Sequence, residues 1–178
     1  MKLILLSILI LNSLLALEIS TRYDVNVTLF EYVGYADITF KKDAKNYEIT
    51  LKATTIGMAA TLLSNRVETF ISRGKIINEQ YVPDVFIKIK ETTKQTKTQT
   101  YYFDHDKKEI KLTEEKIKVV GRPSFDPSTF TVAYKDVKEI SKQEKIEDEY
   151  VENDSLSIYL NTKLNCNAKN KIYNIFAI

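Results

Sequence analysis

Cysteine, glycine and proline are all scarce in this sequence, and each shortage excludes a class of protein. Cys166 is the only cysteine, so no disulfide can form within the chain. Four glycines and three prolines among 178 residues are too few for a linker-rich or disordered protein. We therefore expect the fold to be stabilised by an apolar core, without disulfides.

Residue types that hold metals, cofactors or nucleic acids are also rare. His105 is the only histidine, so a histidine-based metal site would need carboxylates as its other ligands. The formal net charge of +2 gives no electrostatic case for nucleic-acid binding. No P-loop, dinucleotide fingerprint, C-x-x-C or G-x-S-x-G motif is present. We expect no cofactor, no metal and no nucleic-acid partner.

Residues 1–16 have the three parts of a secretory signal peptide. Lys2 supplies a positive charge, residues 3–15 form an apolar run, and Ala16 is a small residue at the expected cleavage site. The run is shorter than the roughly 20 residues that a membrane-spanning helix needs. We therefore expect the protein to be exported to the periplasm and not to span a membrane after cleavage; the alternatives are a buried N-terminal helix or a retained anchor.

The segment after the cleavage site predicts one soluble domain. Position 17 is Leu, whereas a lipid anchor would need a cysteine there. Residues 17–178 are long enough to form a single β-rich domain. Residues 172–178 predict a closing strand, and its apolar end suggests either that the native chain extends past Ile178 or that this strand is paired deep in the sheet.

Alternation of apolar and polar residues predicts strands through most of the chain. The pattern is clear over residues 22–30, 35–41 and 47–53, and it returns over residues 66–72. A further strand is expected near Pro83, where proline favours a bend or bulge. The predicted fold is mainly β, either a curved antiparallel sheet or a partly closed β-barrel, with one or two short helices packed on it.

Four segments depart from this alternation. Residues 56–63 are apolar on almost all sides and predict a short buried helix or turn lying across the sheet. Asp154 is a plausible N-cap for a second short helix, which the pattern extends through Leu164. Mixed charges over residues 135–152 slightly favour a helix, and the composition of residues 121–127 predicts a loop.

The apolar segment and a nearby aromatic residue are the candidate ligand-binding residues. They could form the floor or lid of a cavity, or they could fill the concave face of the sheet and leave no cavity. Core filling is the commoner outcome because protein interiors pack densely. The candidates are Ile56, Met58, Leu62, Leu63 and Phe70.

Lysines recur along residues 88–97 and also allow two interpretations. Lys88, Lys90, Lys94 and Lys97 could form a cationic strip that binds phosphate-bearing envelope lipids. They could instead protect an exposed edge hairpin against pairing with other strands. Because Glu91 interrupts the positive charge, we favour the edge hairpin.

One short cluster contains residue types used in catalysis. Asp104, His105 and Asp106 are adjacent, but successive residues of an extended chain point to opposite faces, so His105 would point away from the two carboxylates, which disfavours a shared site. Acidic residues followed by Lys107 and Lys108 are typical of a solvated turn. We therefore predict a hairpin turn here and identify no catalytic residues.

Several stretches resemble an exported bacterial family, the domain of unknown function numbered 3108. The most specific stretch is Ala53-Thr54-Thr55-Ile56-Gly57-Met58-Ala59-Ala60, and residues 135–152 depart from the family pattern. The resemblance implies a signal peptide, a curved antiparallel sheet or partly closed barrel, and a periplasmic or outer-envelope location. It implies no established activity and no catalytic residues. The other stretches, in chain order, are Tyr23-Asp24-Val25, Gly34 with Ala36, Tyr47-Glu48-Ile49, Thr61-Leu62-Leu63, Phe70, Ser72, Gly74, Tyr102-Phe103-Asp104-His105-Asp106 and Asp154-Ser155-Leu156-Ser157.

These observations favour an exported, non-enzymatic periplasmic protein that binds a lipid-like or apolar component of the cell envelope. The alternative is a structural module that docks on another envelope protein through a sheet edge. A hydrolase is the least favoured of the three, with His105 as its best candidate residue.

Overall fold

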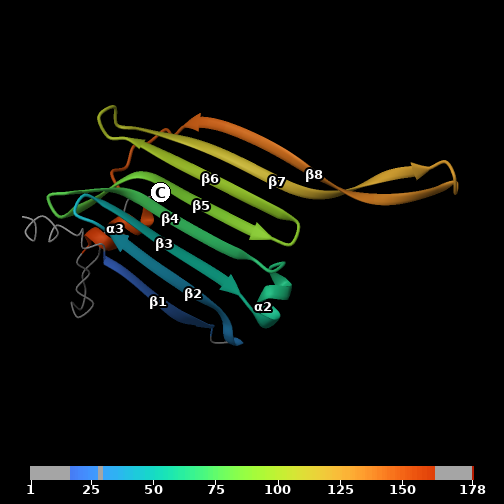
Figure 1. Ribbon diagram of the computed structural model, residues 1–178, viewed down its shortest axis with the longest axis horizontal. Coiled ribbons are helices and arrows are strands. Elements are labelled where there is room, and N and C mark those ends of the chain that lie inside the picture. The colour runs from blue at the N-terminus through green and yellow to red at the C-terminus, as the bar shows by residue number, and fades with distance from the viewer. Residues whose placement is uncertain (1–16, 28–29, 163–177) are drawn as a thin grey trace, which may run out of the picture.

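The computed structural model describes residues 17–27, 30–162 and 178. Eight strands form one antiparallel sheet in chain order, and each strand pairs with the next (Figure 1). A short helix, α2, connects β3 to β4, and a second, α3, follows β8. The elements are β1 (Leu17–Val27), β2 (Phe30–Lys42), β3 (Asn46–Thr55), α2 (Gly57–Leu62), β4 (Val67–Ile77), β5 (Gln80–Thr92), β6 (Gln95–Asp104), β7 (Glu109–Asp126), β8 (Thr131–Ile146) and α3 (Ser155–Asn161).

This architecture confirms the prediction of a mainly β fold with a curved antiparallel sheet and short helices. Within the described ranges the sheet is open, because β1 and β8 are its edge strands. No helix in this part of the chain is long and apolar enough to cross a membrane. The signal peptide prediction and most of the predicted closing strand fall on residues outside the described ranges.

The sheet has two faces of different character, and α3 lies behind it in the view of Figure 1. We call the side that packs against α3 the helix face and the other side the open face. Along β3, Tyr47 and Ile49 are buried on the helix face, whereas Glu48 and Lys52 point to the open face. The period of two in the sequence thus places apolar residues toward the helix.

The core lies between the middle strands and α3. Phe86 of β5 and Ile110 of β7 are completely buried, and Leu156 of α3 packs into the same cluster. Phe86 stacks on Phe70 with ring centroids 6.5 Å apart. The remaining buried members of the cluster are Tyr47, Ile49, Tyr101, Phe103 and Leu112.

The irregularity predicted near Pro83 is confirmed as a register shift between β4 and β5. The shift falls between Arg73 and Gly74, and Gly74 pairs with Pro83. A Cβ atom on Gly74 would lie 2.0 Å from the carbonyl oxygen of Val82. Only glycine allows the two backbones to approach this closely.

The loop predicted for residues 121–127 is wrong except at Pro127, and no part of residues 135–152 forms the predicted helix. Residues 121–126 belong to β7, and residues 135–146 belong to β8. The charged residues of β8 pair across to β7, as in the 2.8 Å contact between Lys142 Nζ and a Glu115 carboxylate oxygen. A strand partner distant in sequence therefore overrides the weak helical preference of this segment.

Candidate functional site

Asp154 fixes α3 on the sheet through a buried polar cluster. Its Oδ1 accepts hydrogen bonds from the backbone N–H groups of Leu156 and Ser157, at 2.7 and 2.9 Å. The Ser157 hydroxyl in turn accepts from the Asp154 N–H, which completes a capping box. The prediction that Asp154 caps a short helix is confirmed, although the helix ends at Asn161.

The same carboxylate links α3 to two strands. Its Oδ2 accepts a 2.6 Å hydrogen bond from Ser72 of β4, and the Ser72 hydroxyl lies 2.9 Å from the Tyr47 hydroxyl of β3. Burial raises the pKa of Asp154, while the hydrogen bonds from Ser72, Ser157 and Leu156 oppose this rise. Burial also raises the pKa of Tyr47. The cluster is therefore a rigid polar anchor inside an apolar core.

An apolar groove runs beside α3 on the helix face. It has a volume of about 390 Å³, within the range of small-molecule sites. Apolar side chains of β2, β3 and β4 form its floor, and α3 forms one wall. The lining residues are Ile38, Ile49, Leu51, Phe70, Ser155, Leu156 and Tyr159.

The apolar surface continues from the groove onto the edge strand β1. Ile19 pairs with Phe40 and Tyr23 pairs with Ala36, so these β1 residues also lie on the helix face. Ile19 and Tyr23 are 49% and 54% exposed. The described residues therefore leave an apolar strip open beside the groove.

Lys88 stands next to the groove on the same face. It pairs with Phe70, which lines the groove. Its ammonium nitrogen lies 5.4 and 5.3 Å from the ring centroids of Phe86 and Tyr101. Burial lowers the pKa of Lys88, while the more distant charges of Asp154 and Glu147 oppose this effect. The side chain is thus a partly dehydrated cation held over aromatic rings.

Further lysines extend the positive charge from Lys88 across the helix face. Lys90, Lys97 and Lys116 form one cross-strand row on β5, β6 and β7. Lys97 pairs with Glu114 at 2.9 Å. Among the described residues no carboxylate oxygen lies within 4.0 Å of the ammonium group of Lys88, Lys90 or Lys116. We call these three residues the lysine cluster.

The edge-hairpin interpretation of these lysines is wrong. β5 and β6 lie in the interior of the sheet, and each is paired on both sides. Lys88, Lys90 and Lys97 therefore protect no free edge, and only Lys94 lies in the connecting turn. Sequence alone did not show this, because the position of a hairpin within a sheet depends on strands far along the chain.

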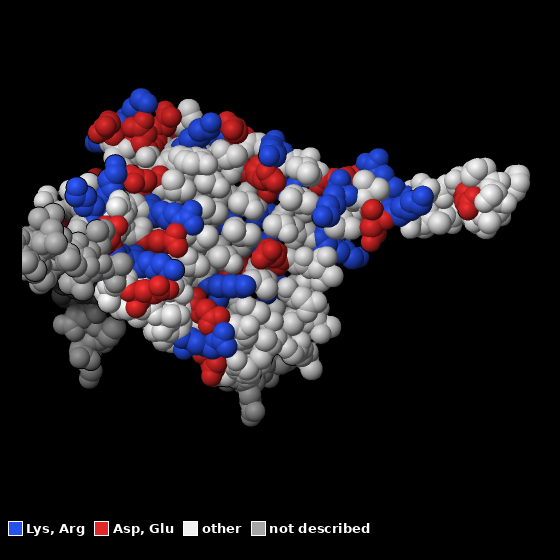
Figure 2. Space-filling view, viewed as in Figure 1, with Lys and Arg blue, Asp and Glu red and all other residues white. Residues whose placement is uncertain are grey.

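The open face has a different arrangement of charge. Figure 2 shows cationic and anionic side chains interleaved across it. Ion pairs join Arg73 to Glu48 and Lys111 to Glu144 across neighbouring strands. Charges that are paired in this way support solubility and specify no ligand.

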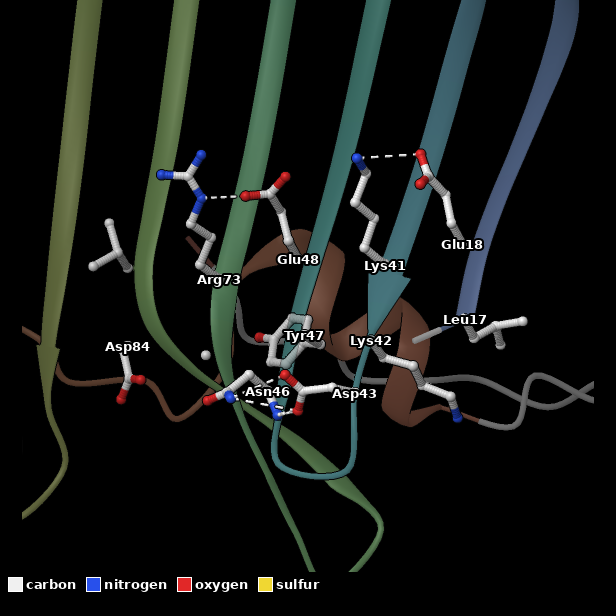
Figure 3. A pocket seen from close by; sticks show the side chains of 12 residues that line it. Leu17, Glu18, Lys41, Lys42, Asp43, Asn46, Tyr47, Glu48, Arg73 and Asp84 are labelled. Carbon is white, nitrogen blue, oxygen red and sulfur yellow. Dashed lines mark hydrogen bonds and ion pairs between the residues drawn. The ribbon is translucent and has the colours of Figure 1, made fainter. Parts of the chain in front are cut away.

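A second hollow, larger than the groove, lies at the end of the sheet around the β2–β3 turn (Figure 3). Its volume is about 560 Å³, and seven of its twelve lining residues are charged. Lys41 pairs with Glu18 and Arg73 with Glu48, and Asp43 accepts hydrogen bonds from Asn46 of the turn (Figure 3). These groups satisfy one another, so this hollow is a weaker candidate than the groove.

The sequence-predicted ligand residues do not come together in one site. Phe70 lines the groove. Met58 and Leu62 lie on α2 and are 66% and 71% exposed. Leu63 lines a separate hollow of about 290 Å³ that includes Val25. Whether the α2 residues bind a ligand stays a prediction.

The expectation that residues 56–63 lie buried across the sheet is wrong. The segment follows the end of β3, and its backbone is tied to β2 by the Ile56 N–H, which donates to the Val33 carbonyl at 3.0 Å. Only Ala60 of α2 is buried. The position across the helix face is taken instead by α3, because its capping network anchors it there.

His105 lies in the predicted turn but is half-buried. Residues 105–108 form the turn, which confirms that prediction. The His105 Nδ1 lies 2.6 Å from the Tyr150 hydroxyl, and its Nε2 lies 2.7 Å from the Pro83 carbonyl oxygen, to which it donates. Within the described ranges neither ring nitrogen bonds to a carboxylate or serine, and no cluster of metal-binding residues is found. The arrangement fits a structural tie between the turn and β5.

The β7–β8 hairpin extends beyond the other strands as an arm (Figure 1). Phe130 and Tyr134 are 84% and 76% exposed, and Phe130 meets Phe125 edge to face at 6.1 Å. Pro123 pairs with Tyr134, and Phe125 pairs with Val132, so these side chains share one face of the arm. Asp126 lies at the tip, where it accepts hydrogen bonds from Ser128.

Comparisons with protein-family models, with curated proteins and with solved structures found no match to this chain. The resemblance to the family of domain 3108 therefore stays a prediction, and the function rests on the geometry described above.

Proposed function

We propose that this protein is an exported, non-enzymatic periplasmic protein that binds a lipid-like or apolar component of the cell envelope in the groove beside α3. The observation that carries the proposal is the apolar groove of about 390 Å³, with Ile38, Leu51 and Phe70 on its floor. Apolar clefts of this size are typical of ligand sites. Burial of a hydrocarbon chain there would release about 25 cal/mol for each Å² removed from water.

The test is native mass spectrometry of the chain produced with its natural leader and purified from its own periplasm. A bound apolar molecule, recovered by extraction and lost on delipidation, supports the proposal. Binding is then measured by displacement of the uncharged fluorophore Nile red with hexadecanol. Protein that carries no lipid and shows no displacement would overturn the proposal.

A matched pair of variants tests whether binding occurs in the groove. Ile38→Trp adds bulk to the groove floor, and we expect it to reduce hexadecanol binding at least tenfold. Thr39→Trp is the control, because the adjacent residue of β2 points to the open face. Equal effects of the two substitutions would show that binding occurs elsewhere.

The second candidate function is docking on another envelope protein through the β7–β8 arm. The observation that favours it is the apolar face formed by Pro123, Phe125, Val132 and Tyr134 on an arm with no other strand beside it in the described sheet. A folded protein with an apolar cleft is a better partner than a membrane, because membrane insertion would desolvate Asp126 at the tip. Cross-linking in cells should trap one dominant partner, and Phe130→Ser with Tyr134→Ser should abolish that product.

A further inference from the structure

We propose that the ligand of the groove is a single-chain amphiphile with an anionic head group, and that Lys88 binds this head group. This inference rests on the proposed function and adds the charge class of the ligand. Its basis is the position of Lys88 opposite Phe70, where the apolar lining of the groove ends and the lysine cluster begins.

The positions of the charges supply the first argument. A cation over the rings of Phe86 and Tyr101, without a carboxylate within 4.0 Å in the described part of the chain, has lost part of its hydration and gained no counter-ion. The charge on Lys97, by contrast, is neutralised by Glu114. An anion beside Lys88 would complete the missing ion pair, and partial burial makes such a pair stronger than one in bulk water.

The chemical character of the helix face also changes along β4 and β5. On the helix face of β4 and β5 the cross-strand pairs run from Ser72 and Phe86, through Phe70 and Lys88, to Glu68 and Lys90. The surface therefore changes from apolar to charged over three successive pairs, and Glu68 is already paired with Arg66, which leaves Lys88 and Lys90 as the cations without a carboxylate partner among the described residues. A hydrocarbon chain in the groove would place its polar end at this boundary, where Lys88, Lys90 and Lys116 stand.

The lysine cluster argues against other occupants. A neutral lipid would leave the charge of Lys88 uncompensated, and a cationic amphiphile would be repelled by all three lysines. A small free anion would not use the groove at all. The arrangement therefore favours a molecule that combines a long apolar chain with a negative charge.

The experiment uses the protein purified from the periplasm and measures how it binds amphiphiles that share one chain length and differ in their head groups. Hexadecanoate, hexadecyl phosphate, hexadecanol and hexadecyltrimethylammonium compete with Nile red, and inorganic phosphate tests for binding of a free anion. We expect the two anionic amphiphiles to bind at least tenfold more tightly than hexadecanol, and inorganic phosphate to cause no displacement. Displacement by hexadecyltrimethylammonium that equals displacement by hexadecanoate would overturn the inference.

Lys88→Gln tests the assigned residue, and Lys94→Gln is its control because Lys94 is an exposed lysine of the β5–β6 turn. We expect Lys88→Gln to remove the preference for anionic head groups while hexadecanol binding stays within twofold of the original. Lys94→Gln should leave both unchanged. Circular dichroism melting confirms that each variant folds, and Lys88→Arg should restore the preference if Lys88→Gln perturbs the core.

The failures of the two proposals are distinguishable. If hexadecanol and hexadecanoate bind equally well to the original protein, the charge inference is wrong and the groove still binds apolar chains. If no amphiphile binds, the proposed function itself is wrong.

Discussion

Asp154→Ala should remove the anchor that holds α3 on the sheet. The substitution deletes an N-cap, which costs about 0.5–2 kcal/mol. It also removes the acceptor at the end of a hydrogen-bond chain. In this chain the Tyr47 hydroxyl contacts the Ser72 hydroxyl, and the Ser72 hydroxyl donates to the carboxylate. Without an acceptor at its end, one of the two buried hydroxyls loses a partner, which costs about 1–3 kcal/mol.

Relief from burying a charge offsets part of this loss, because burial raises the pKa of Asp154. We therefore expect Asp154→Ala to lower the free energy of unfolding by about 2–3 kcal/mol at pH 7. Urea denaturation followed by circular dichroism measures this change. Asp154→Asn is the matched control, because asparagine is an equally good N-cap and its amide keeps partners for Ser72 and the helix N–H groups.

The difference in the free energy of unfolding between the original protein and Asp154→Asn should also depend on pH, and the raised pKa fixes the sign of this dependence. A folded-state pKa above the unfolded value means that the folded protein binds the proton more tightly. The contribution of Asp154 is therefore fully present below the unfolded pKa of about 3.9 and is lost as the pH rises through the raised folded value. The stability of the original protein relative to Asp154→Asn should fall as the pH rises through this window.

Two results would refute this reasoning. A loss smaller than about 0.5 kcal/mol for Asp154→Ala would show that the capping network does not anchor α3. A stability difference from Asp154→Asn that rises with pH over the stated window would show that the pKa is lowered by the hydrogen bonds.

Further predictions concern the core, the bulge and the turn. Phe86→Ala should cost about 3–5 kcal/mol in urea denaturation, since the side chain is completely buried; a loss below about 1 kcal/mol would contradict this core. Gly74→Ala should cost at least about 1–3 kcal/mol, because the new Cβ would overlap the Val82 carbonyl. Gly121→Ala is the control and should be close to neutral, because the nearest neighbour of its Cβ, a Tyr134 ring atom, is 3.7 Å away. Equal shifts in melting temperature for the two variants would contradict the bulge. His105→Ala should cost about 1–2 kcal/mol through the two lost hydrogen bonds, and an unchanged melting temperature would show that the turn is not tied to β5.

Local patterns determined much of the fold. Alternating residues such as those of β3 predict which side of a strand is buried, because successive side chains point to opposite faces. Pro83 predicted the irregularity of β5, since proline has no backbone N–H to donate to the neighbouring strand. Asp154 predicted the start of α3, because an N-cap depends only on residues within one helical turn.

The tertiary structure alone decided the sheet order and the position of the site. Nothing local distinguishes the interior β5–β6 hairpin from an edge hairpin, so the sequence by itself favours edge protection as the role of its lysines. The mixed charges of β8 became a strand because β7 supplied its partner. The sequence determined that Lys88 is a cation and Phe70 is apolar, but only strand pairing placed the two beside each other, because register depends on contacts between distant segments.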